Sequence, residues 1–242
     1  MMDKGLKPIV LALDAAGSFC SAAVAVGQTI LGAERLESVH GQAEKLLPMV
    51  DSAMRQAKLL PSELDLVAVT VGPGSFTGIR VGLAAARGIR LATGAELIGV
   101  TGFEAVAARI AECFSSGFGY LLVALESRRE DLYVQLIDGP RNPLGPPAAV
   151  IPLALAEGVN AAIGTAPLLV AGDAAQRGAQ VLSKRPQTTV LEDTAPDAVG
   201  VLRAALGRWR HGRGDDALRP LYLRPPDVTF PRGRHCSNLK RP

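Results

Sequence analysis

Residues 66–100 constrain the fold more than any other stretch of the chain. The run LVAVTV at 66–71 is continuously apolar, which is typical of a strand buried on both faces of a sheet. A glycine-rich loop leads from it to a helical pattern over 77–93, and ELIGV at 96–100 returns as a strand. Two strands joined through a helix run parallel, so the sequence predicts an α/β protein.

The order of the remaining segments indicates two lobes. Three short strands within 8–34 are expected to pair antiparallel at the start of the chain. A helix over 42–57 and another over 102–115 complete the pattern βββαβαβα. The second half starts in similar style, with strands at 120–125, 132–137 and 168–172 and helices at 174–182 and 196–210. We expect an N-terminal lobe over 1–104, a C-terminal lobe over 105–225 and a basic, poorly ordered tail over 226–242.

The loop GPGSFTG at 72–78 raises the question of phosphate binding. A Walker loop requires GxxxxGK[ST], but the fifth residue after Gly72 is Thr77 and no lysine follows. A dinucleotide-binding GxGxxG fails at the same residue, because Gly78 comes one position late. We therefore expect a tight turn, followed by a helical face of small residues, Gly78, Gly82 and Ala86, which lets another helix approach closely.

Composition and cysteine spacing limit the class of protein. The chain is 48% hydrophobic, but no apolar run approaches the ~20 residues of a membrane span. The N-terminus lacks the cleavage site of a secretory signal. The three cysteines lie far apart without a CxxC pair, which argues against a disulfide framework or a zinc site. These features predict a cytoplasmic globular protein without a membrane segment.

A metal site is not expected. His40 and Glu44 stand one helical turn apart, where a metal-binding helix would carry two histidines. The other histidines, His211 and His235, belong to the basic C-terminal stretch. His40 is therefore interpreted as a residue near a helix cap.

Several stretches together resemble the bacterial TsaB (YeaZ) family, from about Ile9 to Arg224. They are VGPGSFTGIRVG, LALDAAGS, HGQAEKLLPMVD, ALESRREDLYV and PLYLRPPDVT. The resemblance implies the actin, sugar kinase and Hsp70-like (ASKHA) fold, with two related lobes and mixed sheets flanked by helices. It also implies a role in making threonylcarbamoyladenosine, the modified base next to the anticodon of tRNA.

In that family the paralogue TsaD is the catalyst and TsaE is an ATPase. The resemblance therefore implies a non-catalytic dimerising and activating subunit that has no cofactor, pairs with TsaD and TsaE, meets tRNA through the complex and forms a homodimer when alone. It also implies that helices 42–57 and 77–93 form the contact surface. The residues predicted at that interface are Leu46, Leu47, Val50, Met54, Gly78, Gly82 and Ala86.

Two further groups of residues are singled out by the same resemblance. Asp14, Gly17 and Ser18 occupy the place where ATP-using relatives of this fold hold phosphates and magnesium, and we interpret them as a vestigial nucleotide loop. The charged turn Arg128, Arg129 and Glu130 is expected to face a cleft between the lobes. The alternatives left open are an autonomous ATP-dependent small-molecule kinase of the same fold and a metallopeptidase-like relative.

Overall fold

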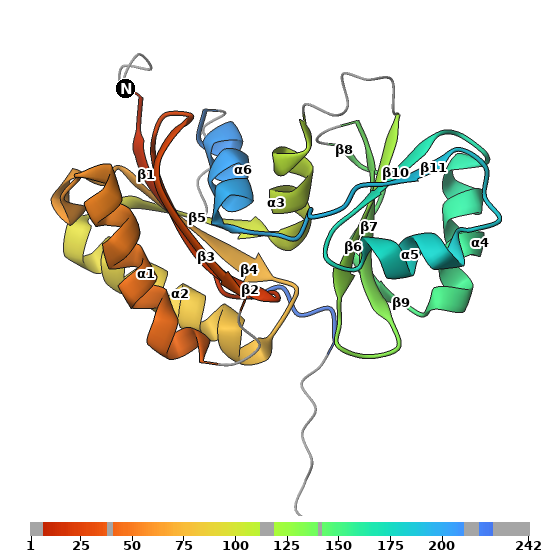
Figure 1. Cartoon of the computed structure of the whole chain (residues 1–242), viewed down its shortest axis with the longest axis horizontal. Coiled ribbons are helices and arrows are strands. Elements are labelled where there is room, and N and C mark those ends of the chain that lie inside the picture. Colours follow the sequence, from red (N-terminus) through yellow and green to blue (C-terminus); the bar gives the residue numbers. More distant parts are fainter. Residues whose placement is uncertain (1–6, 38–40, 112–118, 140–141, 211–217, 225–242) are drawn as a thin grey trace, which may run out of the picture.

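The computed structural model of the chain describes residues 7–37, 41–111, 119–139, 142–210 and 218–224. Figure 1 shows two lobes, each built on one sheet, with helices α3 and α6 lying between the two sheets. Within the described ranges, no helix is both long enough and apolar enough to cross a lipid bilayer.

The first lobe contains a mixed five-stranded sheet in the order β3-β2-β1-β4-β5. Its strands are β1 (Ile9–Asp14), β2 (Phe19–Val26), β3 (Thr29–Glu37), β4 (Leu66–Gly72) and β5 (Glu96–Thr101). The first three strands pair antiparallel, whereas β4 pairs parallel with both β1 and β5. The structure therefore confirms both predictions from the sequence: antiparallel pairing of the first three strands, and parallel pairing of strands that are joined through helices.

Helices α1 (Gln42–Ala57) and α2 (Phe76–Thr93) contact each other and cover one face of this sheet. Side chains alternate between the two faces of a strand, so Leu11 and Leu13 point toward these helices while Val10 and Ala12 point away. The opposite face is covered by α6 (Ala198–Arg210). Every strand at the centre of the sheet is therefore buried on both faces, as its continuous apolar sequence indicates.

The second lobe contains a six-stranded sheet in the order β11-β10-β6-β7-β8, with β9 also paired to β7. Its strands are β6 (Tyr120–Glu126), β7 (Leu132–Asp138), β8 (Asn142–Pro143), β9 (Ala148–Val150), β10 (Leu168–Ala171) and β11 (Thr188–Val190). Helices α4 (Pro152–Ile163) and α5 (Ala175–Val181) pack on one face, and residues of α3 (Gly102–Arg109) pack on the other. A short 3-10 helix, η1 (Pro61–Glu63), precedes β4 in the first lobe.

One expectation about these elements needs correction, and one helix was not expected from the sequence. Helix α3 ends at Arg109, well before the expected residue 115, and residues 112–118 lie outside the described ranges. The periodicity of the sequence does not predict α4, because its exposed positions are largely alanine and glycine and give little contrast between an apolar and a polar face.

The expected C-terminal lobe over 105–225 is not one continuous unit. Helix α6 packs on the first sheet, and the segment 218–224, called the strap below, runs from the first lobe to the second. The Leu221 amide in the strap donates to the Val71 carbonyl of β4 over 2.7 Å, while Leu223 packs against the core of the second lobe. The chain therefore crosses between the lobes more than once, which fixes their relative positions. The predicted tail over 226–242 lies outside the described residues.

Candidate functional site

The glycine-rich loop between β4 and α2 is locked against the turn between β1 and β2. The Ser75 amide donates to the Ala16 carbonyl over 2.7 Å, and the Ser75 hydroxyl caps α2 by accepting from the Gly78 amide over 3.2 Å. A Cβ atom on Gly74 would lie 2.2 Å from the Ala16 carbonyl oxygen. The loop thus serves close backbone packing, in agreement with the failed phosphate-binding patterns.

The small residues of α2 also serve packing, but their partner differs from the one expected. A Cβ atom on Gly78 would lie 2.0 Å from the Ala15 carbonyl oxygen, and one on Gly82 would contact the Val69 side chain at 3.4 Å. The close approach is therefore to a turn and a strand of the same lobe, and the prediction of another helix at this face is corrected.

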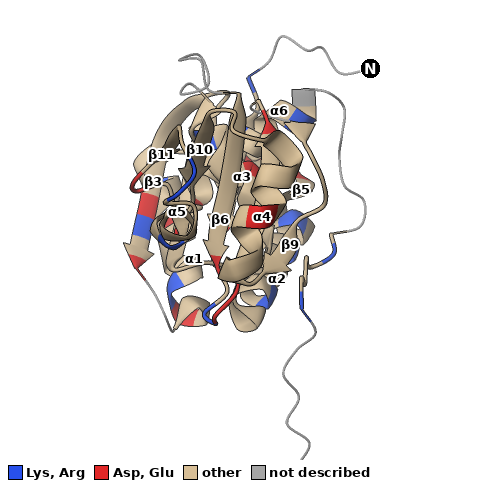
Figure 2. Ribbon diagram, turned by 90° about the vertical axis from the view of Figure 1, so that its right-hand side faces the viewer, with Lys and Arg blue, Asp and Glu red and all other residues tan. Residues whose placement is uncertain are grey.

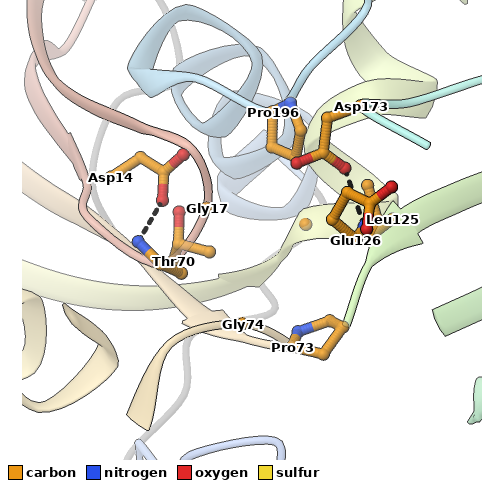
Figure 3. Close-up of a pocket in the computed structure, with 11 residues that line it drawn as sticks. Asp14, Gly17, Thr70, Pro73, Gly74, Leu125, Glu126, Asp173 and Pro196 are labelled. Atoms are coloured by element: carbon orange, nitrogen blue, oxygen red, sulfur yellow. Dashed lines mark hydrogen bonds between the residues drawn. The ribbon is translucent and has the colours of Figure 1, made fainter. Parts of the chain in front are cut away.

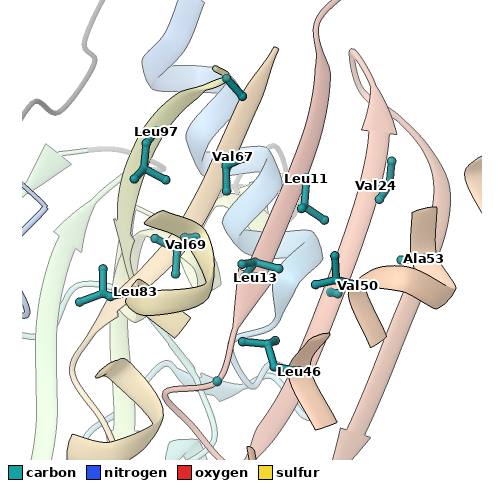
Figure 4. Close-up of a cluster of buried hydrophobic side chains, with 14 of the residues drawn as sticks. Leu11, Leu13, Val24, Leu46, Val50, Ala53, Val67, Val69, Leu83 and Leu97 are labelled. Carbon is teal, nitrogen blue, oxygen red and sulfur yellow. The ribbon is translucent and has the colours of Figure 1, made fainter. Parts of the chain in front are cut away.

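Six of the seven residues predicted at a partner interface belong to the core of the first lobe. These buried residues are Leu46, Val50, Met54, Gly78, Gly82 and Ala86. Figure 4 shows Leu46 and Val50 pointing toward the strands of the sheet. An amphipathic helix on a sheet turns its apolar stripe inward, so the predicted interface on these six side chains is corrected. Leu47 is the exception, because it remains 54% exposed.

The outward faces of α1 and α2 carry charged residues such as Asp51 and Arg87 together with a second set of apolar and small residues. This second set is Leu47 and Pro48 on α1, and Ala84, Gly88 and Leu91 on α2. The Leu91 side chain is 89% exposed. Since the two helices lie side by side, we call these five residues the outer helix face.

The other predicted residues gather between the lobes. Asp14 ends β1 and is wholly buried, with its Oδ1 accepting from the Ala16 amide over 3.0 Å. Its Oδ2 has no hydrogen-bond partner among the described residues. Burial, which disfavours the charged carboxylate, is the largest cause that raises the pKa of Asp14 to about 6, and the nearby Asp197 and Asp173 carboxylates act in the same direction.

Asp173 faces the predicted nucleotide loop from the second lobe. Its Oδ2 accepts from the Ser18 hydroxyl over 3.2 Å, and its Oδ1 accepts from the Glu126 amide over 3.0 Å. Burial raises the pKa of this carboxyl as well. Figure 3 shows Asp14 and Asp173 on two sides of a small inner cavity of about 10 Å³. Asp14, Gly17 and Ser18 are thus brought together, with Asp173 as a fourth member that the sequence interpretation missed.

A signal for Asp173 was present in the sequence. It follows the buried strand β10 just as Asp14 ends the buried strand β1, and carboxyl ends of parallel strands are where sites form in α/β proteins. The two aspartates are related by their equivalent places in the two lobes rather than by a shared motif.

A larger cleft of about 720 Å³ opens outward from this point. It is lined by the β1–β2 turn, the glycine-rich loop, the β6–β7 turn and the strap. Arg128 and Arg129 line it, as predicted for the charged turn, but Glu130 does not. The Glu130 carbonyl instead accepts from the Arg177 guanidinium over 3.1 Å.

No three His, Cys, Asp or Glu side chains gather around a point where a metal ion could bind, within the part of the chain that the structure describes. His40, His211 and His235 lie outside that part, so the interpretation of His40 as a residue near a helix cap stays a prediction.

The chain matches one family model and several individual proteins of known sequence. A family model for TsaD, described as tRNA N6-adenosine threonylcarbamoyltransferase, matches residues 37–139. An uncharacterized protein of Mycobacterium tuberculosis is 31% identical over 224 residues, which cover 90% of this chain and 93% of the relative. The tRNA threonylcarbamoyladenosine biosynthesis protein TsaB of Buchnera aphidicola is 32% identical over 97 residues, or 40% of this chain and 45% of the relative.

Two solved structures from Pseudomonas aeruginosa have the same fold. One, described as an uncharacterized protein with similarity to the peptidase YeaZ, is 26% identical, with a TM-score of 0.74 over 90% of this chain and all of that one. The other, YeaZ, is 24% identical, with a TM-score of 0.73 over 89% of this chain and all of that one. Together with the two mixed sheets flanked by helices, these likenesses confirm the predicted ASKHA fold class.

Proposed function

Since the chain belongs to the TsaB (YeaZ) family and thereby to the proteins of tRNA threonylcarbamoyladenosine synthesis, we propose that it is the non-catalytic subunit that docks on and activates the catalytic subunit TsaD. The docking surface is the outer helix face. In isolation the same surface pairs two copies of this chain, and TsaE joins the assembly with TsaD.

The single observation that carries this proposal is the exposure of large apolar side chains on paired helices. Leu91 is 89% exposed and Leu47 is 54% exposed, and small residues such as Ala84 and Gly88 lie on the same face. Apolar side chains gathered on one surface are typical of protein interfaces, and small residues allow a partner helix to approach closely.

The arrangement around Asp14 supports the non-catalytic part of the proposal over a kinase. The Asp14 carboxylate is wholly buried, and the inner cavity beside it has a volume of about 10 Å³, which is about the space of one water molecule. A phosphate group is larger than that space. The Asp173 Oδ2 accepts from Ser18 and thereby joins the two lobes, while its Oδ1 accepts from the Glu126 amide within the second lobe.

The test is a measurement of mass by light scattering on the purified chain, on its cognate TsaD and on the mixture. The unchanged chain should form a heterodimer with TsaD. Leu91→Arg should abolish it, because a charge would be buried within the contact. The matched control is Leu153→Arg, since Leu153 on α4 is 87% exposed but lies on the second lobe.

Each outcome of the light-scattering test supports or overturns one part of the proposal. Loss of pairing in Leu91→Arg but not in Leu153→Arg supports the outer helix face. Equal pairing in both variants overturns that surface, and no pairing of the unchanged chain with folded TsaD overturns the proposed function. The kinase alternative requires saturable ATP binding in calorimetry, which we do not expect.

A further inference from the structure

Two aromatic rings stand at the outer part of the cleft between the lobes. Phe76 begins α2 and Tyr222 belongs to the strap, and their ring centroids lie 5.4 Å apart at an interplanar angle of 33°. Both rings line the cleft and are 39% and 40% exposed. The Arg80 guanidinium lies 3.7 Å from the centroid of the Phe76 ring and covers one face of it. Because both residues line the cleft and are partly exposed, some aromatic surface stays open to a ligand there.

Basic side chains line the same cleft as the rings. Arg128 and Arg129 line the same cleft from the β6–β7 turn, and both are exposed. Arg128 has φ 62°, an uncommon backbone conformation for a residue other than glycine, and has no ion-pair partner among the described residues. Arg224 of the strap also lines the cleft, but its charge is offset by Asp131 at 2.8 Å. The rim thus offers positive charge beside the aromatic rings.

The deeper end of the cleft is acidic. Glu126 and Asp173 line both the cleft and the small inner cavity that reaches Asp14, and the charge of Glu126 is offset by the Arg177 guanidinium at 2.5 Å. Each carboxylate oxygen has two lone pairs, so Asp173 retains acceptor capacity after its bonds with Ser18 and the Glu126 amide. A phosphate group placed at this end would meet like charge, whereas an amino group would find an acceptor.

We propose that the cleft binds one unstacked nucleotide of an RNA strand, with the base pointing inward. The base stacks on Phe76 and Tyr222, its exocyclic amino group donates to Asp173, and the flanking phosphates stay outside on Arg128 and Arg129. The volume of about 720 Å³ lies within the usual range of small-molecule pockets, roughly 300–1,000 Å³, and leaves room for a base with its ribose.

The charge distribution favours a local single-stranded contact over a duplex. Figure 2 shows, for the described residues on the side in view, Lys and Arg interspersed with Asp and Glu along the ribbon. Binding along a duplex draws on many phosphate contacts, whereas stacking of one base requires only an aromatic platform and a few cations. The inference rests on the proposed function, because a role in tRNA modification brings an RNA to this subunit.

The test uses fluorescence anisotropy with labelled single-stranded RNA homopolymers and the full chain, alone and mixed with TsaD. Oligo(A) and oligo(C) carry exocyclic amino groups and should bind more tightly than oligo(U), by roughly tenfold. Tyr222→Ala should weaken binding of oligo(A) by about tenfold through loss of stacking, and Arg128→Glu should weaken binding of all three RNAs. The matched control is Lys184→Glu, because Lys184 is exposed and does not line the cleft.

Light scattering of each variant with TsaD separates this inference from the docking proposal. Weaker RNA binding with unchanged pairing supports the cleft as the RNA site. Unchanged RNA binding in Tyr222→Ala and Arg128→Glu overturns it, as does equal affinity for the three homopolymers. Binding of free AMP without binding of RNA also overturns it and assigns the cleft to a free nucleotide. Failure of the unchanged chain to pair with TsaD, with RNA binding retained, overturns the docking proposal alone.

Discussion

The Ser18 hydroxyl donates a hydrogen bond to Asp173 Oδ2 over 3.2 Å, between two residues that are 155 positions apart in the chain. Ser18 belongs to the β1–β2 turn of the first lobe, and Asp173 follows β10 of the second. The bond therefore joins the two lobes at the bottom of the cleft, and the position of the Asp173 carboxylate depends on it.

Ser18→Ala removes this bond between the lobes. The free energy of unfolding should fall by about 1 kcal/mol, the usual contribution of a hydrogen bond, because the Glu126 amide still bonds to Asp173. Urea denaturation followed by circular dichroism measures this change. An unchanged unfolding midpoint would contradict a stabilising role for the bond.

Asp14 should make the stability of the protein depend on pH. Burial raises its pKa from 3.8 to about 6 in the folded chain, so the folded state binds the proton more tightly than the unfolded state. Stability from this group is full below about pH 4 and is lost as the pH rises through 6. At about 1.4 kcal/mol per pKa unit, the loss by pH 7 is of order 3 kcal/mol.

Asp14→Asn tests this pH dependence, because asparagine does not titrate. The raised pKa of Asp173 contributes in the same direction, so some pH dependence should remain in the variant. Urea midpoints measured at pH 5 and pH 7 should lie closer together in Asp14→Asn than in the unchanged chain. Equal pH dependence in both proteins would show that Asp14 does not titrate in this range.

Gly78→Ala should destabilise the first lobe. Its Cβ would lie 2.0 Å from the Ala15 carbonyl oxygen, so the backbone of the β1–β2 turn must move, at a cost of roughly 1–3 kcal/mol. Gly88→Ala is the matched control in the same helix, because a Cβ there meets nothing within 4 Å. The control should stabilise the helix by about 0.5–1 kcal/mol. In thermal unfolding, the midpoint temperature should fall for Gly78→Ala and rise for Gly88→Ala, relative to the unchanged chain.

Arg224→Ala should loosen the strap from the second lobe. The Asp131 side chain is 2% exposed, so loss of Arg224 leaves a buried carboxylate without its ion partner. The cost is about 1–3 kcal/mol, discounted for the partial exposure of Arg224. Arg55→Ala is the control, since its ion pair with Asp51 is exposed on both sides and contributes about 0.5 kcal/mol or less. Equal unfolding midpoints for the two variants would contradict this prediction.

The sequence alone determined the order and direction of the elements in the first lobe. The helix predicted over 42–57 is α1, and the helix predicted over 77–93 begins one residue earlier as α2. These predictions succeeded because hydrophobic periodicity and turn residues act locally. The short stretches that resemble the TsaB family also identified the fold class.

Only the tertiary structure decided what each apolar face packs against. Periodicity groups Leu46 and Val50 on one face of α1, but burial against the protein's own sheet and burial against a partner have the same hydrophobic signature. The return of α6 to the first sheet and the meeting of Ser18 with Asp173 depend on contacts between distant parts of the chain. Such contacts leave no local pattern, so the burial of the predicted interface residues, the full lining of the cleft and the course of the strap had to come from the structure.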